Sequence, residues 1–462
     1  MDGMNSIDAA HWQERLDTIA GEAGVVGASL GILRVGDGGD ELVRAATGVL
    51  NARTGRGVTP DSLFQIGSIT KPMTGTVAMQ LVDEGKIGLD QPVRELLPDF
   101  RLVSDEQTNG VTVRHLLNHS SGIDGDVFVD TGRGDDCLTK FMTVLETVPQ
   151  MHPLGELWSY CNTGFSMLGR IIEVVTGETW DVAMRARLFE PLGMRHTVTL
   201  PEDALLFDTA VGHMTPPPDA TVTPVWMLPR SGGPAGVVIC SVADLLAFAR
   251  GHMMDGAAAD GTRVLSAASS RAMRDHSVDI PATSLTGDTW GLSFERFDWH
   301  GATLFGHDGA TLGQTAYLRV LPQAGLAVAL LTNSTSSYGL FRPLFVEIFD
   351  ELAGVKMPDE LRLPPAPYAM DMAPWVGTYE RGDTRLDVID GADGPSMRIT
   401  QIGDLADLEG LPVEDVRLIP VREGLCAIHQ ESRGRNLPVW FIQLSDGARV
   451  VHYSSRATRR VV

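Results

Sequence analysis

The chain has 462 residues, of which 43% are hydrophobic and 21% are charged, the composition of a soluble globular protein with one large or two ordinary domains. Its 59 acidic residues against 37 basic residues give a formal net charge of −22. Such a surface repels phosphate backbones and anionic lipids, so we expect neither a nucleic-acid partner nor membrane association.

The N-terminal residues and the cysteines indicate a compartment. Residues 1–24 include five acidic side chains and no apolar run of signal-peptide length, and the chain has no transmembrane segment. The four cysteines, Cys137, Cys161, Cys240 and Cys426, show no C-x-x-C spacing, so neither a zinc site nor a disulfide framework is expected. These features predict a reduced, cytoplasmic protein.

The first half of the chain predicts strands near the N-terminus and then mostly helices. A turn at Gly36-Asp37-Gly38-Gly39 predicts a hairpin. An amphipathic helix is predicted to end at Gly85, and helical pieces and loops follow from about residue 90 to residue 230. The predicted helices are 7–20, 69–84, 113–118 and 164–176, and the predicted strands are 25–35 and 41–48.

Strands return further along the chain. Residues 315–321 and 326–333 flank Pro322-Gln323-Ala324-Gly325, which predicts a second hairpin, and a closing helix is expected over 338–353. Strands at both ends of this region predict one antiparallel sheet flanked by helices, with the helical middle as a second lobe, an α/β (α+β) fold.

The C-terminal part has a different composition. Five prolines between residues 356 and 374 predict a stiff linker. Beyond it, short alternating segments separated by Gly and Asp turns predict a small all-β barrel or sandwich. The expected domains are therefore residues 1–356, a Pro-rich linker at 357–373 and a β-domain at 374–462.

The stretch Ser68-Ile69-Thr70-Lys71 suggests nucleophilic chemistry at the start of the helix 69–84. A serine hydroxyl needs a base to take its proton, and a lysine three residues later lies on the same helical face. A chain of this length contains about one S-x-x-K motif by chance. The motif therefore depends on its companions elsewhere in the chain.

Three companions occur in order: the segment from Leu116 to Gly122 that ends His-Ser-Ser-Gly, then Tyr160-Cys161-Asn162, then His307-Asp308-Gly309. S-x-x-K, Y-x-N and H-x-G in this order resemble the penicillin-recognising serine enzymes, which include class C β-lactamases, DD-peptidases, esterases and D-aminopeptidases. The resemblance covers roughly residues 10–355. It implies the β-lactamase/penicillin-binding-protein fold, followed here by a lipocalin-like barrel.

The resemblance also implies roles for these residues. Ser68 is the nucleophile, and the helix dipole favours its alkoxide. Burial is expected to lower the pKa of Lys71 enough for it to act as a base. Tyr160 relays protons, and whether Lys71 or Tyr160 is the acylation base stays open. Asn162 orients substrate amides, while the backbone N–H groups of Ser68 and Ala310 form the oxyanion hole.

One departure bears on the substrate. β-Lactamases and DD-peptidases usually carry K-T-G where this chain has His307-Asp308-Gly309. An imidazole with an aspartate beside it weakens capture of a substrate carboxylate, so β-lactam or DD-peptide hydrolysis is the less favoured activity. H-x-G is typical of the esterase, D-aminopeptidase and thioesterase branches.

Some residues have a second interpretation. His115 and His119 are four residues apart, but without a third ligand they predict no metal site, and Cys161 is expected to face the core. The segment Gly232–Gly236 resembles a pocket-wall turn more than a phosphate loop. Arg456, with Arg459 and Arg460, is either part of a solvated basic tail or a small-domain arginine that binds an anionic substrate group over the site.

The resemblance, at this length and with two parts, points to penicillin-binding-protein-type thioesterases and to D-aminopeptidases. We expect Ser68 to attack the carrier thioester of a non-ribosomal peptide, and the N-terminal amine of that peptide to release a head-to-tail macrolactam. The substrate is then a small-molecule or peptidyl thioester, the partner a peptidyl carrier protein, and no cofactor is needed. The alternative is a D-stereospecific amidase, aminopeptidase or esterase that uses water, and a non-catalytic scaffold is disfavoured by the intact motifs.

Overall fold

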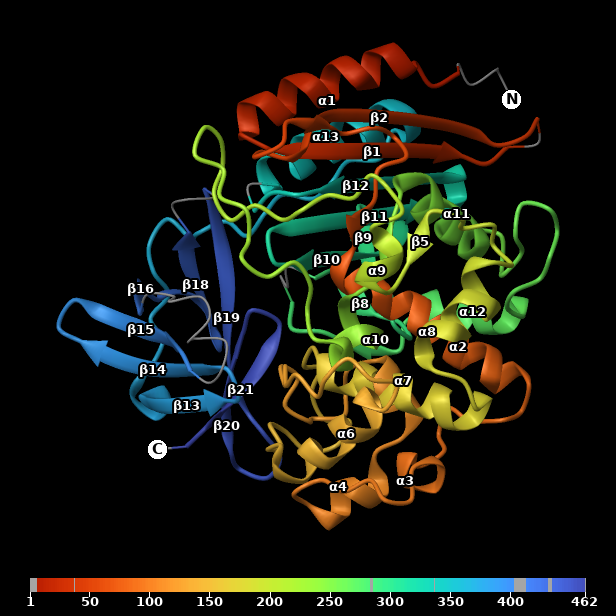
Figure 1. Cartoon of the computed structure of the whole chain (residues 1–462). Helices are drawn as coiled ribbons and strands as arrows, with labels where there is room; N and C mark the ends of the chain where they lie inside the picture. The colour runs from red at the N-terminus through yellow and green to blue at the C-terminus, as the bar shows by residue number, and fades with distance from the viewer. Residues whose placement is uncertain are drawn as a thin grey trace.

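The computed structural model describes residues 6–36, 38–282, 286–335, 337–402, 413–430 and 434–461. It contains a central antiparallel sheet covered by helices, a helical lobe, and a second antiparallel sheet built by the C-terminal residues (Figure 1). The predicted fold class is confirmed. Residues 1–5 and Asp37, at the tip of the predicted first turn, lie outside the described residues. None of the described helices has the length and apolar character needed to span a bilayer.

The central sheet brings together strands from both ends of the main domain. Its order is β3-β2-β1-β12-β11-β10-β9-β8-β7, and β1 pairs with β12 from Ala28 opposite Thr332 to Arg34 opposite Leu326. Both predicted hairpins are present, as β1–β2 and β11–β12. The strands are β1 (Gly27–Arg34), β2 (Glu41–Asn51), β3 (Arg56–Gly57), β7 (Val278–Asp279), β8 (Thr289–Trp290), β9 (Glu295–Trp299), β10 (Ala302–Thr311), β11 (Gln314–Leu321) and β12 (Leu326–Thr332).

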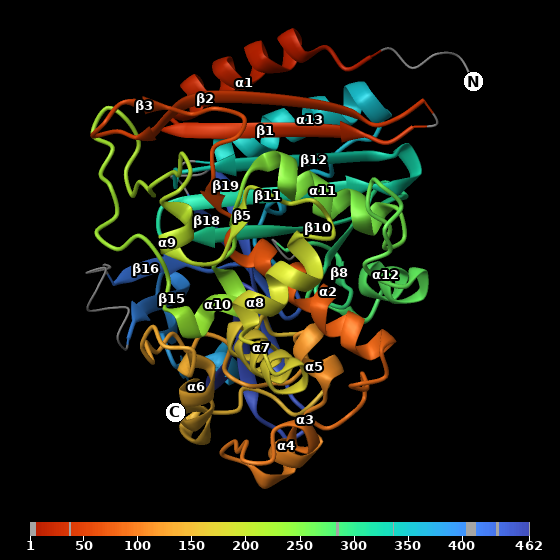
Figure 2. The same ribbon diagram turned by 45° about the vertical axis from the view of Figure 1, so that its right-hand side comes forward.

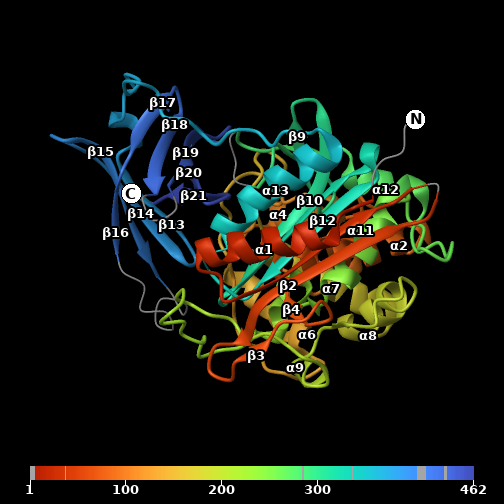
Figure 3. The ribbon, with the colours of Figure 1, turned by 90° about the horizontal axis from the view of Figure 1, so that it is seen from above.

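Helices cover both faces of this sheet. The helices α1 (Ala9–Ala23) and α13 (Tyr338–Ala353) lie side by side on one face (Figure 3), and α11 (Val242–Met253) packs on the other face against β1 and β12. Every residue of β12 is buried. A strand that is buried on both faces has a continuous apolar sequence rather than an alternation of apolar and polar residues. This explains the apolar sequences of β1 and β12.

The helical lobe is formed by the middle of the chain and lies on the side of the sheet away from α1 (Figure 2). A short sheet, β4-β6-β5, accompanies it. The helices of this region are α3 (Val93–Leu96), α4 (Asp105–Gly110), α5 (Val113–Leu117), α6 (Cys137–Val144), α7 (Asn162–Thr176), α8 (Trp180–Met184), α9 (Pro201–Ala204), α10 (Gly233–Gly236) and α12 (Ala267–Arg274). The strands of the short sheet are β4 (Phe64–Gln65), β5 (Thr197–Val198) and β6 (Ile239–Cys240).

The helix α2 (Thr70–Asp83) differs from its prediction in one respect. It was expected to be amphipathic, but all residues from Thr70 to Leu81 are buried. The reason is its position, because it contacts α7, α8, α10 and α12 on different sides. A helix enclosed in this way has no polar, solvated face. Its first turn, and the residues just before it, are therefore held by packing on all sides.

The C-terminal residues form a nine-stranded antiparallel sheet that curls into a nearly closed barrel, drawn in blue in Figure 1. The end strand β16 lies close to β18, next to the other end strand β17. This confirms the lipocalin-like barrel. The strands are β13 (Gly377–Arg381), β14 (Thr384–Gly391), β15 (Gly394–Gln401), β16 (Glu414–Arg417), β17 (Ile419–Arg422), β18 (Leu425–Gln430), β19 (Arg435–Gln443), β20 (Arg449–Tyr453) and β21 (Arg456–Arg460).

Candidate active site

Ser68 and Lys71 form a close pair at the start of α2. A 3₁₀ turn, Gly67–Ile69, leads into the helix and leaves Ser68 partly accessible, whereas Lys71 is 0% exposed. The Lys71 Nζ atom lies 3.1 Å from Ser68 Oγ and donates to the carbonyl of Ala235 at 2.7 Å. Burial, reinforced by the nearby Arg456 charge, holds the pKa of Lys71 well below its usual value. The pair therefore has the geometry of a nucleophile and its base.

Tyr160 lies against the side chains of Lys71 and Arg456. The Lys71 Nζ atom is 4.7 Å from the centre of its ring, and the Arg456 guanidinium carbon is also 4.7 Å from that centre. Burial raises the pKa of Tyr160, while its contact with Ser68 and the Arg456 charge act in the opposite direction. The phenol is thus protonated at rest, and its buried hydroxyl is near Ser68 but has no hydrogen-bond partner among the described residues.

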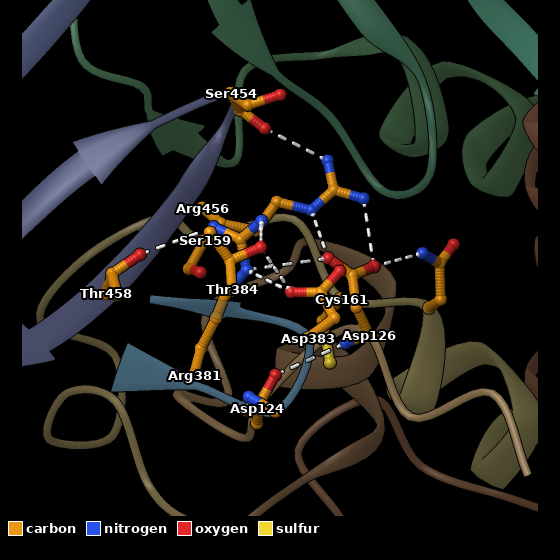
Figure 4. Close-up of polar contacts among 12 residues, drawn as sticks. Asp124, Asp126, Ser159, Cys161, Arg381, Asp383, Thr384, Ser454, Arg456 and Thr458 are labelled. Atoms are coloured by element: carbon orange, nitrogen blue, oxygen red, sulfur yellow. Dashed lines mark hydrogen bonds and ion pairs between the residues drawn. The ribbon is translucent and has the colours of Figure 1, made fainter. Parts of the chain in front are cut away.

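Asn162 is held by Asp126, which belongs to a polar cluster that joins the lobe to the barrel through Arg456 and Arg381 (Figure 4). Asn162 Nδ2 donates to Asp126 Oδ1 at 2.7 Å, and Arg456 grips the same carboxylate through Nε at 2.7 Å and Nη2 at 3.0 Å. Burial alone would raise the pKa of Asp126, but the Arg456 guanidinium prevails and lowers it to about 2. Arg381 of β13 adds a second cation, 3.9 Å from Asp126.

Arg456 is therefore not part of a solvated tail. It is half-buried, begins β21 directly after the turn of the β20–β21 hairpin, and lies on the cavity wall, where the second interpretation put it. Two of its nitrogens bind Asp126 and the third donates to the Ser454 carbonyl. The hairpin is anchored beside it, because the Tyr160 N–H donates to the Ser455 carbonyl and the Ala457 N–H donates to Ser159 Oγ.

His307 is buried on β10 next to the cavity, with its ring 6.1 Å from that of Tyr160. Its Nδ1 lies 2.5 Å from the Asp308 carbonyl, which can only accept, so Nδ1 carries the proton. Burial lowers the pKa of His307 to about 3, so the ring is neutral. Asp308 was expected to bind substrate and to disfavour carboxylates, but its own carboxylate is paired with Arg319 at 2.5 and 3.1 Å.

The predicted oxyanion hole has the required close approach of two backbone segments. A Cβ on Gly309 would lie 1.9 Å from the Ile66 carbonyl and 2.9 Å from the Ser68 nitrogen. A Cβ on Gly67, whose φ is 52°, would lie 2.5 Å from the Ala310 nitrogen. Only glycine at both positions lets the Ser68 and Ala310 N–H groups sit together beside Ser68 Oγ.

A cavity of about 1010 Å³ connects these residues. Its walls come from the main domain, from residues 357–362 after α13, and from the barrel. The predicted site residues on its wall are Ser68, Tyr160, Asn162, His307, Asp308, Gly309, Ala310 and Arg456. Lys71 lies behind Ser68, out of contact with solvent. The structure thus brings every predicted site residue to one place.

Sequence reasoning missed Asp126, Arg381 and Glu295. Asp126 follows the His-Ser-Ser-Gly segment closely, which is a weak signal, and nothing near Arg381 in the sequence marks it. The signal for Glu295 was its position as the one acidic residue in the largely apolar segment from Trp290 to Phe297. All three line the cavity.

The remaining sequence predictions concern the glycine-rich segment 232–236, Cys161 and two histidines. The residues Gly232, Ala235 and Gly236 line the cavity wall, as predicted. Cys161 is buried and caps α7, with burial raising its pKa to about 12. His115 and His119 do not share a helix, because α5 ends at Leu117 and His119 adopts a φ of 60°. His119 Nδ1 instead accepts from the Cys161 N–H at 3.0 Å.

Comparison with known proteins agrees with this geometry. Residues 12–352 match the family described as Beta-lactamase. Penicillin-binding protein 4 of Amycolatopsis lactamdurans is 48% identical over 380 residues, which are 81% of this chain and 98% of that protein.

Solved structures extend the likeness to the barrel. The structure of SurE with D-Leu has a TM-score of 0.79 at 30% identity and covers 98% of this chain and 99% of its own. A D-stereospecific amidohydrolase from Streptomyces sp. has a TM-score of 0.59 at 27% identity, covering 75% of this chain and 99% of its own.

Proposed function

Because the chain belongs to the Beta-lactamase family and is a serine acyl transferase or hydrolase, we propose that it releases a non-ribosomal peptide from a carrier thioester as a head-to-tail macrolactam. The observation that carries this proposal is the cavity, in which a partly accessible Ser68, with the buried Lys71 of lowered pKa beside it, is bordered by a second domain.

Acylation follows from the contacts of Ser68. Lys71, acting with Tyr160, takes the hydroxyl proton while Oγ attacks the thioester carbonyl carbon. The Ser68 and Ala310 N–H groups stabilise the oxyanion. The C–S bond breaks, and the proton passes to the departing thiolate. The product is a peptidyl ester on Ser68.

The D-configuration of the acylating residue is supported by the comparisons. The SurE structure was solved with D-Leu, and the Streptomyces amidohydrolase is D-stereospecific. In the present chain Asn162 donates to Asp126, which Arg456 also binds, and we infer that Asn162 holds the amide next to the scissile bond. We infer a peptide with a D-residue at its C-terminus.

The second step transfers the acyl group to the amino terminus of the same peptide. The cavity is large enough for a folded-back peptide of several residues, and residues 357–362 and the barrel cover it. Amine and ester held together react in an effectively unimolecular step, which lets aminolysis outpace hydrolysis. The substrate requires a peptidyl carrier protein as partner and a cytoplasmic location, and both belong to the proposal.

A D-stereospecific hydrolase is the second candidate, supported by the amidohydrolase likeness. The name of the Amycolatopsis relative adds acylation of Ser68 by a penicillin as a third, weaker candidate. The neutral His307 stands where a cationic lysine would bind the penicillin carboxylate, so slow acylation by a penicillin is expected.

The test uses a synthetic linear peptide thioester that ends in a D-residue, with its L-epimer as control. Mass spectrometry of the products separates the candidates. Mainly cyclic product from the D-substrate supports the cyclase, whereas mainly free acid supports the hydrolase. If neither thioester nor an activated ester acylates Ser68, the acyl-enzyme proposal is wrong.

A further inference from the structure

Glu295 is a buried acidic residue in the cavity that the chemistry above does not use. It begins β9, is 1% exposed, and lies opposite Gly306 of β10. Its Oε1 atom accepts from the Asp308 N–H at 3.2 Å and lies 3.5 Å from His307 Nδ1. Within the described part of the chain, its Oε2 atom is buried without a hydrogen-bond partner.

Such a carboxyl group is costly to bury, which calls for a reason. The nearest cation in the sheet, Arg319, is already committed to Asp308 through two nitrogens. Burial and the Asp308 charge raise the pKa of Glu295, while the charges of Arg319 and Lys71 act in the opposite direction. The His307 Nδ1 atom lies 3.5 Å from the Glu295 carboxyl, while its proton is donated to the Asp308 carbonyl.

The His307 ring has one free basic atom. Because Nδ1 carries the proton, Nε2 holds the lone pair, and Nε2 has no hydrogen-bond partner among the described residues. His307 Nδ1–H donates to the Asp308 carbonyl, and the Asp308 N–H donates to Glu295 Oε1, so the Asp308 backbone links Glu295 to the imidazole. A carboxyl group that fixes this backbone helps to hold the ring with its free Nε2 toward the cavity.

We propose that Glu295 is a positioning residue for His307, and that His307 takes the proton from the acceptor when the acyl-enzyme is resolved. This inference rests on the proposed function. The acceptor nitrogen, or a water oxygen, bonds to the acyl carbon as its proton passes to His307 Nε2. The bond from that carbon to Ser68 Oγ breaks, and Oγ receives a proton from Tyr160. The His307 proton then returns to the Tyr160 oxygen.

Different residues therefore serve the acylation step and the deacylation step. Lys71 and Tyr160 serve the attack by Ser68, on the side of the cavity formed by α2. His307 and Glu295 serve the incoming acceptor, on the side formed by β9 and β10. Loss of the Glu295 carboxyl should slow deacylation and leave acylation nearly unchanged.

The experiment measures the two steps separately with N-acetyl-D-leucine p-nitrophenyl ester. Single-turnover release of p-nitrophenol reports acylation, and mass spectrometry of the acyl-enzyme reports its decay to water or to an added amino-acid amide. The variants are Glu295→Gln, which is isosteric and keeps the acceptor for Asp308 N–H, and Glu295→Asp. Glu173→Gln is the matched control, since Glu173 is also buried but lies on α7 away from the cavity wall.

Loss of a general base slows a reaction by about a hundredfold or more. Because Glu295 acts through His307, we expect Glu295→Gln to slow deacylation by at least about tenfold. Acylation should stay within about threefold of the wild-type rate. Without the carboxyl, His307 is held less firmly, so the plateau of the deacylation profile should fall. Glu295→Asp should recover part of the rate. In a His307→Gln background, Glu295→Gln should have no further effect.

Two results would overturn the inference while leaving the proposed function intact. One is deacylation by Glu295→Gln within threefold of the wild type and of Glu173→Gln. The other is a full Glu295→Gln effect in the His307→Gln background. The absence of any acyl-enzyme on Ser68 in the wild type would instead refute the proposed function itself.

Discussion

The guanidinium of Arg456, from the barrel, stacks 4.7 Å from the ring centre of Tyr160, from the helical lobe. The same arginine binds Asp126, which in turn holds Asn162. One residue of the second domain therefore contacts, directly or through one carboxylate, two candidate catalytic or substrate-binding groups. The barrel is part of the active site rather than an appended module.

Breaking the Asp126–Arg456 pair should be costly and non-additive. Asp126→Ala removes the carboxylate partner of a half-buried guanidinium, and we expect it to lower the free energy of unfolding by about 1–3 kcal/mol. Arg456→Ala should cost a similar amount, and the double variant should cost clearly less than the sum. Urea unfolding measures all three.

The exposed pair Arg459–Asp446, at 2.7 Å on the same hairpin region, is the control for that cycle. Its disruption should change the free energy of unfolding by less than about 1 kcal/mol. Additive costs at Asp126 and Arg456 would contradict the buried pair.

Lys71→Met should remove the base without burying a charge. The side chain is of similar length and apolar, so the fold should keep its stability, while acylation by an activated ester should fall at least about a hundredfold. Acylation in the wild type should fall as the pH drops through the lowered pKa of Lys71, because only the neutral amine accepts a proton. The variant should lack this limb, and stopped-flow acylation rates from pH 5 to pH 9 would reveal it if present.

Gly309→Ala should disrupt the oxyanion hole. The new methyl group would lie 1.9 Å from the Ile66 carbonyl, so β10 and the Ser68 turn must separate, and the Ala310 N–H moves with them. We expect acylation to fall about a hundredfold or more. Gly21→Ala on α1 is the control, since its methyl group meets nothing within 4 Å, and it should stabilise the protein by up to about 1 kcal/mol. Unchanged acylation in Gly309→Ala would remove Ala310 from the site.

Stability should fall as the pH is lowered below 6.5. Burial lowers the pKa of His252 and of His452 to about 3, so between pH 6.5 and pH 3 the unfolded chain binds protons that the folded chain does not. Each histidine then removes up to about 1.4 kcal/mol per pH unit. His252→Gln should show a smaller slope of unfolding free energy between pH 7 and pH 5 in urea titrations, and an equal slope would refute the assignment.

Local sequence was sufficient wherever a short stretch of chain makes its own geometry. Ser68 and Lys71 are one helical turn apart, so their proximity follows from helix periodicity. The two hairpins follow from turn residues between apolar strands, and the order of three motifs identified the family before any distance was known. Tyr160, Asn162 and His307 distinguished the motif Ser68-Ile69-Thr70-Lys71 from a chance match. Their proximity in space does not follow from the sequence.

Tertiary structure alone decided which charges are buried and how they are paired. Nothing local distinguishes Arg456 from a solvated residue, and it is the docking of the barrel that buries it against Asp126, 330 residues away in the chain. Asp308 is paired by Arg319 across the sheet, and α2 lost its expected polar face because helices pack around it. The sequence by itself identified the fold, the candidate nucleophile and the lysine beside it, because these depend on local periodicity and ordered motifs. Packing between distant segments determined the electrostatics of the site, because burial and pairing depend on neighbours that no local pattern specifies.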